Sequence, residues 1–195
     1  MKILCLYNNT IATELFEQIA AAGHETILST EAPDVAFYES GAFDLTISYT
    51  FRHILRQEHL DALGGNTVNL HNSYLPYNRG TSPNLWSILE GTPRGVSLHY
   101  MDAQLDKGRI ITQVLLPPVR GDETLRSTYE ALDRAAKSLL LDALTWYPMW
   151  PSMCKLPEGQ GTYHSLKDEK RYLDALVSYD MTVEEFLLRY RALRQ

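Results

Sequence analysis

Two polar residues, Asn69 and His71, lie within the segment T-V-N-L-H, whose composition is otherwise that of a buried strand. Residues two apart on a strand leave the same face, with their Cα atoms ~6.5 to 7 Å apart. An amide N–H can donate a hydrogen bond to a developing oxyanion, and an imidazole titrates near neutral pH and can move a proton. The pair therefore suits acyl transfer. A structural role fits the same short pattern, with Asn69 ending a strand ladder and His71 as a hydrogen-bonded core histidine.

A third candidate, Asp106, follows 37 residues after Asn69 in the segment Q-L-D-K-G. A carboxylate beside His71 would favour the imidazolium and fix its tautomer. Asp-Lys-Gly is also typical of a hairpin turn, so Asp106 taken alone predicts only a turn. The combination of Asn69, His71 and Asp106 is what predicts a reactive site.

Strands that alternate with helices are predicted to position these residues. Short apolar runs predict strands over residues 2–7, 24–29, 45–50 and 67–71, and amphipathic segments predict helices over 11–22 and 54–63. This alternation favours an α/β, Rossmann-like open sheet, mostly parallel, with helices on both faces and a C-terminal helical tail. Asn69 and His71 would then lie at the carboxyl end of a parallel strand, where such sheets bind their ligands.

The second half of the chain predicts a less regular arrangement. Pro76, Gly80 and several Asn and Ser residues predict a loop over 72–81. The elements expected after it are a helix over 83–90 capped by Ser82, strands over 95–101 and 109–116, a helix over 123–146 capped by Asp122, a surface segment over 147–164, and a helix beginning at the capping box Thr182-x-x-Glu185. We expect one domain over 1–195, in which a core over 1–150 carries an extension over 151–195.

The composition disfavours several classes of function. The 195 residues carry 18 Lys and Arg against 24 Asp and Glu, a net charge of −6, which counts against nucleic acid as the main partner. Cys5 and Cys154 are far apart and match no disulfide or metal-binding framework. No apolar run approaches the ~18 residues that a membrane span needs, and the usual glycine-rich nucleotide motifs and H-E-x-x-H are absent. We therefore expect a cytoplasmic protein without metal, membrane or nucleic acid.

The chain also contains motifs of a known family. From Asn69 on it reads N-L-H-N-S-Y-L-P-Y-N-R-G-T-S-P-N, and from Gly95 on it reads G-V-S-L-H-Y-M-D-A-Q-L-D-K-G-R-I-I. In order and approximate spacing these motifs resemble the folate-dependent formyltransferases, which include glycinamide ribonucleotide transformylase, methionyl-tRNA formyltransferase and the sugar N-formyltransferases. The resemblance implies that Asn69, His71 and Asp106 are catalytic and that 10-formyltetrahydrofolate donates the formyl group to an amine. It further implies that Asn69 and a protonated His71 stabilise negative charge on the formyl oxygen.

The resemblance also implies where the folate binds. The family holds the pterin largely through backbone groups after the third strand, here the segment S-Y-T-F-R-H-I-L. One wall of the folate site is expected to contain Phe51, Arg52, His53 and Ile54. The other is expected to contain Tyr100, Asp102 and Leu105. By pattern alone, the first group also suits core positions and a solvated helix start.

The expected acceptor is the primary amine of a small molecule. The loop S-Y-L-P-Y-N-R-G with the following P-N-L-W-S, the segment 161–168 and the tail 191–193 resemble the sugar N-formyltransferases, which implies a dTDP-, UDP- or GDP-linked amino-dideoxy sugar. Residues 7–10, Y-N-N-T, replace the glycine-containing loop that holds the acceptor phosphate in the purine enzyme. The residues expected to bind the acceptor are Asn8, Ser73, Tyr77, Asn78 and Arg79, with Arg79 donating to the diphosphate.

Other functions stay open. A glycinamide ribonucleotide-type transformylase would use the same donor, and a formyltetrahydrofolate hydrolase would use water in place of the amine. A non-catalytic module would bind folate without turnover. A metal-dependent hydrolase would use His71, His99 and Asp106. The sequence also leaves open whether the chain forms a homodimer.

Overall fold

The four apolar runs in the first half of the chain all form strands of one six-stranded sheet in the computed structural model, which describes residues 1–194. The strands are β1 (Lys2–Leu6), β2 (Glu25–Ser29), β3 (Leu45–Tyr49), β4 (Thr67–His71), β6 (Gly95–Tyr100) and β7 (Ile110–Leu115). Their order is β2-β1-β3-β4-β6-β7. The first four pair in parallel, and β6 pairs antiparallel with both β4 and β7. The predicted α/β fold with a mostly parallel sheet is confirmed.

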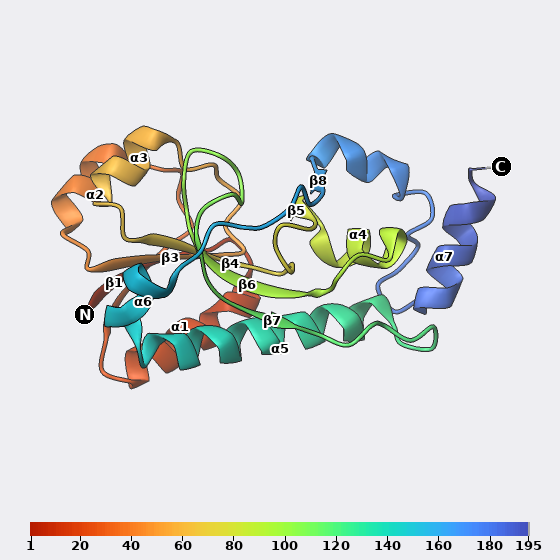
Figure 1. The fold of residues 1–195 in the computed structure, drawn as a ribbon, viewed down its shortest axis with the longest axis horizontal. Helices are drawn as coiled ribbons and strands as arrows, with labels where there is room; N and C mark the ends of the chain where they lie inside the picture. The colour runs from red at the N-terminus through yellow and green to blue at the C-terminus, as the bar shows by residue number, and fades with distance from the viewer. Residues whose placement is uncertain (195) are drawn as a thin grey trace.

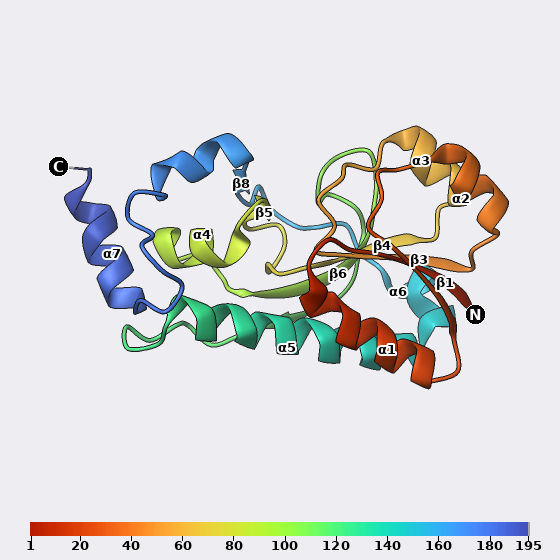
Figure 2. The same ribbon diagram turned by 180° about the vertical axis from the view of Figure 1, so that it is seen from behind.

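Helices cover both faces of this sheet (Figure 1, Figure 2). One face is covered by α1 (Thr13–Ala21), which a 3-10 turn at Thr10–Ala12 precedes, and by the long α5 (Leu125–Leu144). The other face is covered by α2 (Val35–Gly41) and α3 (Gln57–Ala62). No helix within residues 1–194 combines the length and apolar character that crossing a bilayer requires.

The first strand illustrates why the sequence is apolar at every position from Ile3 to Leu6. Ile3 and Cys5 lie in the core between the sheet and α1 and α5, whereas Leu4 and Leu6 lie in the core beneath α2 and α3. Successive side chains of a strand leave opposite faces, so a strand covered on both faces buries all of them. Polar side chains on such a sheet, such as Asn69 and His71, therefore need specific partners.

The C-terminal part of the chain packs around α4 (Pro83–Glu90). Trp86 lies in a buried cluster with Leu125 of α5 and with Phe186 of α7 (Val183–Ala192). The two-residue strands β5 (Arg79–Gly80) and β8 (Tyr163–His164) pair in parallel, and a 3-10 helix at Leu166–Arg171 follows β8. This pairing connects the loop after β4 to the C-terminal part.

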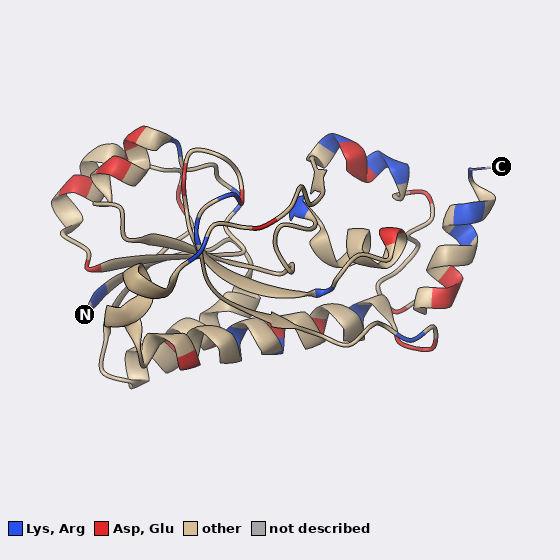
Figure 3. Ribbon diagram, viewed as in Figure 1, with Lys and Arg blue, Asp and Glu red and all other residues tan. Residues whose placement is uncertain are grey.

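The last helix begins where the capping box predicts. Glu185 N donates to Thr182 Oγ1 across 3.1 Å, and Thr182 N donates to Glu185 Oε2 across 2.8 Å. Figure 3 shows acidic residues in the first turn of α7 and basic residues in its last turn, which are Glu184 and Glu185, and Arg189 and Arg191. This distribution complements the helix dipole, so both charge and capping define the ends of α7.

One predicted helix cap is wrong, and a second lies at the predicted position but makes no capping hydrogen bond. Thr124, not Asp122, caps α5, because Thr124 Oγ1 accepts from Ser127 N, while the Asp122 side chain pairs with Arg120 on the surface. Ser82 precedes α4 as predicted, but its hydroxyl donates to Glu169 Oε1 across 2.7 Å and makes no capping hydrogen bond. A long-range partner has replaced the local one in the case of Ser82.

The segment over 147–164 does not simply cross the surface. It contains a 3-10 turn at Tyr147–Met149 and the short helix α6 (Trp150–Met153). Trp150 is fully buried, and its indole Nε1 donates to Ala143 O across 3.0 Å. The Trp150 side chain anchors this segment to the main core. The prediction of a surface segment, which rested on the Pro and Gly content, did not take this tryptophan into account.

The structure also differs from the sequence prediction at α2, which was not expected, and at α3, which begins later than expected. The sequence analysis predicts no helix at α2, which is only seven residues long. Asp34 caps this helix, because its Oδ1 accepts from Ala36 N and Phe37 N. The helix expected over 54–63 begins only at Gln57 as α3. Residues 50–56 are therefore a loop at the carboxyl end of β3, available to line a site.

Candidate active site

Asn69 and His71 point to the same face of the sheet, as predicted. Val68 and Leu70 belong to the core beside α1 and α5, so the two polar residues leave the opposite face. In the antiparallel pairing of β4 with β6, Asn69 lies directly opposite His99. The carboxyl end of β4 therefore carries a group of polar side chains rather than a single isolated one.

The connection between β6 and β7 brings Asp106 to this group. Asp106 has a φ of 53° and is only 7% exposed. Its Oδ1 lies 3.4 Å from Asn69 Nδ2, and its Oδ2 lies 3.7 Å from His71 Nε2. Oδ2 also accepts a hydrogen bond of 2.8 Å from Gly80 N. The structure thus brings together the three residues that the sequence analysis singled out for chemistry.

The surroundings of Asp106 hold its carboxylate in the charged form. Burial alone would raise the pKa of Asp106, but the charge of His71, the hydrogen bond and charge of His99, and the Gly80 N–H outweigh it. The pKa of Asp106 therefore lies well below its ordinary value. Near neutral pH this group is therefore a charged carboxylate that accepts hydrogen bonds.

The ring of His71 has one nitrogen oriented by the protein. Its Nε2 lies 3.3 Å from the carbonyl oxygen of Asn78 and on the same side as Asp106. A carbonyl oxygen can only accept, so Nε2 carries a hydrogen in this arrangement. The second ring nitrogen can then take up or release a proton, which is what general acid–base catalysis needs.

His99 is the residue of this group that the sequence analysis considered only as a metal ligand. It is 1% exposed, and its Nε2 lies 3.4 Å from Asn69 Nδ2 and 3.6 Å from Asp106 Oδ1. Its position in a buried strand, seven residues before Asp106, was the available signal. Among residues 1–194, no set of three or more His, Cys, Asp or Glu side chains is arranged to hold a metal ion.

Two large apolar side chains are exposed on the loops that flank this group. Ile54, after β3, is 72% exposed, and Leu105, next to Asp106, is 45% exposed. Phe51 and Met101, on the same two loops, pack against one buried cluster that lies beneath α2 and α3. The two loops are thus anchored together, and their exposed apolar side chains are suited to contact a flat ring.

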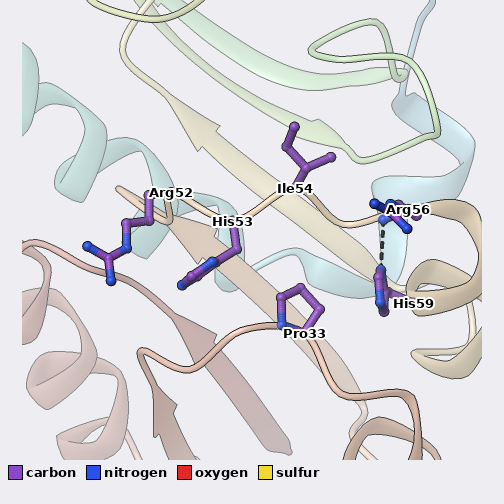
Figure 4. Close-up of a pocket in the computed structure, with 6 residues that line it drawn as sticks. All are labelled: Pro33, Arg52, His53, Ile54, Arg56 and His59. Carbon is purple, nitrogen blue, oxygen red and sulfur yellow. Dashed lines mark hydrogen bonds between the residues drawn. The ribbon is translucent and has the colours of Figure 1, made fainter. Parts of the chain in front are cut away.

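A polar pocket of about 390 Å³ adjoins the loop after β3 (Figure 4). Its lining residues are Pro33, Arg52, His53, Ile54, Arg56 and His59. Arg56 N donates to His59 Nδ1 across 2.9 Å, which ties the loop to α3. Within the described residues, neither Arg52 nor Arg56 forms an ion pair with a carboxylate, so the pocket offers two guanidinium groups to an anion.

Two residues expected in the folate site do not join this group. Tyr100 leaves the opposite face of β6 from His99, packs against the main core, and lines a separate pocket of about 200 Å³ with Asn66. Asp102 is exposed, and its Oδ1 accepts from Gln104 N across 2.8 Å within a turn. Alternation along β6 accounts for the position of Tyr100, because adjacent side chains of a strand leave opposite faces.

Several residues expected to bind the acceptor instead hold loops in place. Asn8 Nδ2 donates to Thr30 O, and Asn8 Oδ1 accepts from Arg52 N, each across 2.9 Å. The Asn8 side chain therefore joins the loops that follow β1, β2 and β3. Ser73 is buried, and its hydroxyl donates to Tyr77 O.

Asn78 is likewise occupied within the protein. It is buried, its Nδ2 donates to Thr92 Oγ1 across 2.7 Å, and its Oδ1 accepts from Thr162 Oγ1 across 3.1 Å. Asn78 N also donates to Thr162 Oγ1 across 2.8 Å. With its side chain buried and bonded to Thr92 and Thr162, Asn78 contributes its carbonyl oxygen to the orientation of His71.

The adjoining part of the same loop presents polar atoms without partners. Tyr77 and Arg79 are partly exposed, and Arg79 Nε is buried without a hydrogen-bond partner. Asn72 Oδ1 and Thr81 Oγ1 are also buried without a hydrogen-bond partner among residues 1–194. Buried polar groups are normally hydrogen-bonded, so three unpaired ones within ten residues of His71 make this loop a candidate for contact with a polar ligand.

Comparisons with known proteins relate this chain to formyl transferases. The family model described as Formyl transferase matches residues 7–144. The dTDP-4-amino-4,6-dideoxyglucose formyltransferase of Mycobacterium bovis is 30% identical over 151 residues, which cover 77% of this chain and 63% of that protein. The methionyl-tRNA formyltransferase of a Geobacillus species is 37% identical over 102 residues, covering 52% of this chain and 32% of that protein. The chain thus spans under two thirds of the length of these relatives.

A solved structure is similar over nearly the whole chain. It is the formyltransferase PseJ from Anoxybacillus kamchatkensis, crystallised with UDP-4,6-dideoxy-4-formamido-L-AltNAc and tetrahydrofolate. The two chains are 31% identical and superpose with a TM-score of 0.81, covering 97% of this chain and 100% of the other. The likeness therefore includes the residues after 144 that the family model leaves unmatched.

Proposed function

Because this chain belongs to the formyl transferase family, we propose that it transfers a formyl group from 10-formyltetrahydrofolate to the primary amine of a nucleotide-linked amino sugar. The observation that carries the proposal is the convergence of Asn69, His71 and Asp106 at the carboxyl end of β4. We propose that residues 1–195 act as one catalytic domain in the cytoplasm.

These three residues have distinct roles in the proposed reaction. When bound, 10-formyltetrahydrofolate supplies a formyl group attached to nitrogen, which an amine can attack. Asn69 Nδ2 has two hydrogens, and if one is directed to Asp106, the other is available to the formyl oxygen as negative charge develops. His71 takes the proton of the attacking amine and passes it to the folate nitrogen as the bond between that nitrogen and the formyl carbon breaks, and Asp106 stabilises the positive charge that His71 carries in between.

The loops around Asp106 support binding of the donor. The exposed side chains of Ile54 and Leu105 are suited to the flat faces of a pterin. The adjoining pocket with Arg52 and Arg56 is suited to the carboxylates of the donor's glutamate. Donor binding in this proposal uses Phe51 as support for the loop, and it does not use Tyr100.

The acceptor class is supported by two relatives and by one part of the site. The mycobacterial relative is named for a dTDP-linked amino sugar, and PseJ was crystallised with a UDP-linked formamido sugar. In this chain, Arg79 and Thr81 carry unpaired polar atoms beside Gly80, whose N–H binds Asp106. We propose that Arg79 binds the diphosphate and that Tyr77 and Thr81 contact the rest of the acceptor.

A single set of assays tests the proposal. The purified chain is incubated with 10-formyltetrahydrofolate, with and without a panel of dTDP-, UDP- and GDP-linked amino sugars, and products are analysed by mass spectrometry. A sugar nucleotide that gains the mass of one CO, with folate turnover only when the amine is present, supports the proposal. Turnover without an amine would instead identify a hydrolase, and binding without turnover would identify a folate-binding module. A glycinamide ribonucleotide arm tests the purine-type alternative.

A further inference from the structure

We infer that His99 is a positioning residue, which sets the orientation of the Asn69 amide and of the Asp106 carboxylate. The inference goes beyond the three residues to which the proposed function assigns chemistry. The test of the inference by transfer kinetics rests on that proposed function, whereas the test by crystal structures of variants does not.

The His99 ring is held in one orientation by the backbone. Its Nδ1 lies 2.8 Å from Tyr100 O, and a carbonyl oxygen can only accept, so Nδ1 carries a hydrogen. The peptide that supplies this carbonyl is itself held, because Met101 N donates to Thr67 O across 2.8 Å. His99 is also buried, so its ring has little room to turn.

This orientation directs His99 Nε2 between Asn69 and Asp106 in either charge state. In a neutral ring, Nε2 has a lone pair and shares with Asp106 Oδ1 the one hydrogen that Asn69 Nδ2 directs to this side, since Nδ2 lies 3.4 Å from each. In a protonated ring, Nε2 carries a hydrogen and forms an ion pair with Asp106 Oδ1, 3.6 Å away. In both cases one nitrogen restrains the two groups that act on the formyl oxygen and on His71.

The other contacts of the two groups do not replace His99. Asp106 Oδ2 is occupied by Gly80 N and faces His71, but Oδ1 has only Asn69 and His99 near it among the described residues. The hydrogen-bonding contacts of Asn69 Nδ2 within that part of the chain are Asp106 and His99. Without His99, the Asn69 amide could rotate, and a buried carboxylate oxygen would lose a partner.

Two substitutions separate positioning from a purely structural role. In His99→Asn, the side-chain amide can reach the position of Nδ1 and keep the hydrogen bond to Tyr100 O, but it leaves the position of Nε2 empty. In His99→Gln, the longer amide reaches the position of Nε2, where it can accept from Asn69 and donate to Asp106. His24→Asn, before β2, is the matched control.

The test compares transfer kinetics and thermal unfolding of the three variants, with crystal structures of the His99 variants. We expect His99→Asn to lower kcat by about 100-fold with the acceptor KM within about 3-fold, and His99→Gln to keep kcat within about 10-fold of the wild type. We also expect the Asn69 amide or the Asp106 carboxylate to shift in His99→Asn. A wild-type rate in His99→Asn, or equal losses in both variants, would overturn the inference.

Two further measurements keep the two proposals separate. If the wild type transfers no formyl group to any amine, the proposed function fails. The crystal structures then still test the role of His99. If Asn69 and Asp106 do not move in His99→Asn, the inference about His99 is overturned. If His99→Asn does not fold, nitrogen NMR of the wild type decides, since the inference requires a proton on His99 Nδ1. An unprotonated Nδ1 would overturn it.

Discussion

Gly80 N donates a hydrogen bond to Asp106 Oδ2 across 2.8 Å, so the loop after β4 and the connection between β6 and β7 meet at one carboxylate. Gly80 also belongs to β5, which pairs with β8 in the C-terminal part. Its φ is +91°, and a Cβ built there would overlap His164 O. A backbone position that only glycine fills comfortably therefore links the C-terminal part to the reactive group.

Gly80→Ala is expected to disturb both stability and catalysis. The positive φ alone costs a side chain about 1 to 2 kcal/mol, and the overlap with His164 O forces β5 away from β8 and from Asp106. Gly159→Ala is the matched control, because Gly159 has a similar φ of +86° with open space around it. Thermal unfolding and kcat measure the outcome. Equal behaviour of the two variants would show that the overlap at Gly80 has no effect.

His71→Asn and Asp106→Ala are each expected to lower kcat by about 10²- to 10⁴-fold, because each removes a group that moves or stabilises the transferred proton. Folding should largely persist, which circular dichroism and thermal unfolding can verify. Asp142→Asn, an exposed position on α5, serves as the control for loss of an acidic residue. A rate near that of the wild type in either site variant would remove the proposed roles.

The lowered pKa of Asp106 predicts how stability depends on pH. A carboxyl group with a lowered pKa in the folded state stabilises the protein above its unfolded pKa, here 3.8, and loses that contribution as pH falls through the folded value. The free energy of unfolding of the wild type should therefore exceed that of Asp106→Asn most at neutral pH. The difference should shrink below about pH 4. Urea titrations over this range measure it, and a difference that stays constant would contradict the lowered pKa.

Arg79 is expected to affect the acceptor and not the donor. A charge-assisted hydrogen bond contributes about 1.5 to 3 kcal/mol, so Arg79→Met should raise the acceptor KM by about 10- to 100-fold and leave the donor KM unchanged. Arg79→Lys keeps the positive charge but loses the planar guanidinium group, so its acceptor KM should lie between those of the wild type and of Arg79→Met. Arg134→Met, on the exposed side of α5, is the control. A raised donor KM would assign Arg79 to the folate site instead.

Features set by neighbouring residues could be predicted from the sequence. The common face of Asn69 and His71 follows from the two-residue period of a strand, and the start of α7 follows from the capping box of Thr182 and Glu185. The same local reasoning placed Ser82 at the start of α4 but missed the partner of its hydroxyl, which is Glu169, 87 positions away. Local propensity decides only where no distant partner competes.

The sequence by itself determined the apolar strands, the mostly parallel sheet and the three residue types whose chemistry suits formyl transfer, because these depend on short periods and on motifs. Only the tertiary structure decided that His99 lies opposite Asn69, that Asn78 is enclosed while Arg79 keeps an unpaired nitrogen, and that Tyr100 leaves the other face. These outcomes depend on strand register and on hydrogen bonds between residues far apart in the chain. Such contacts form only when the whole sheet and its C-terminal part pack together.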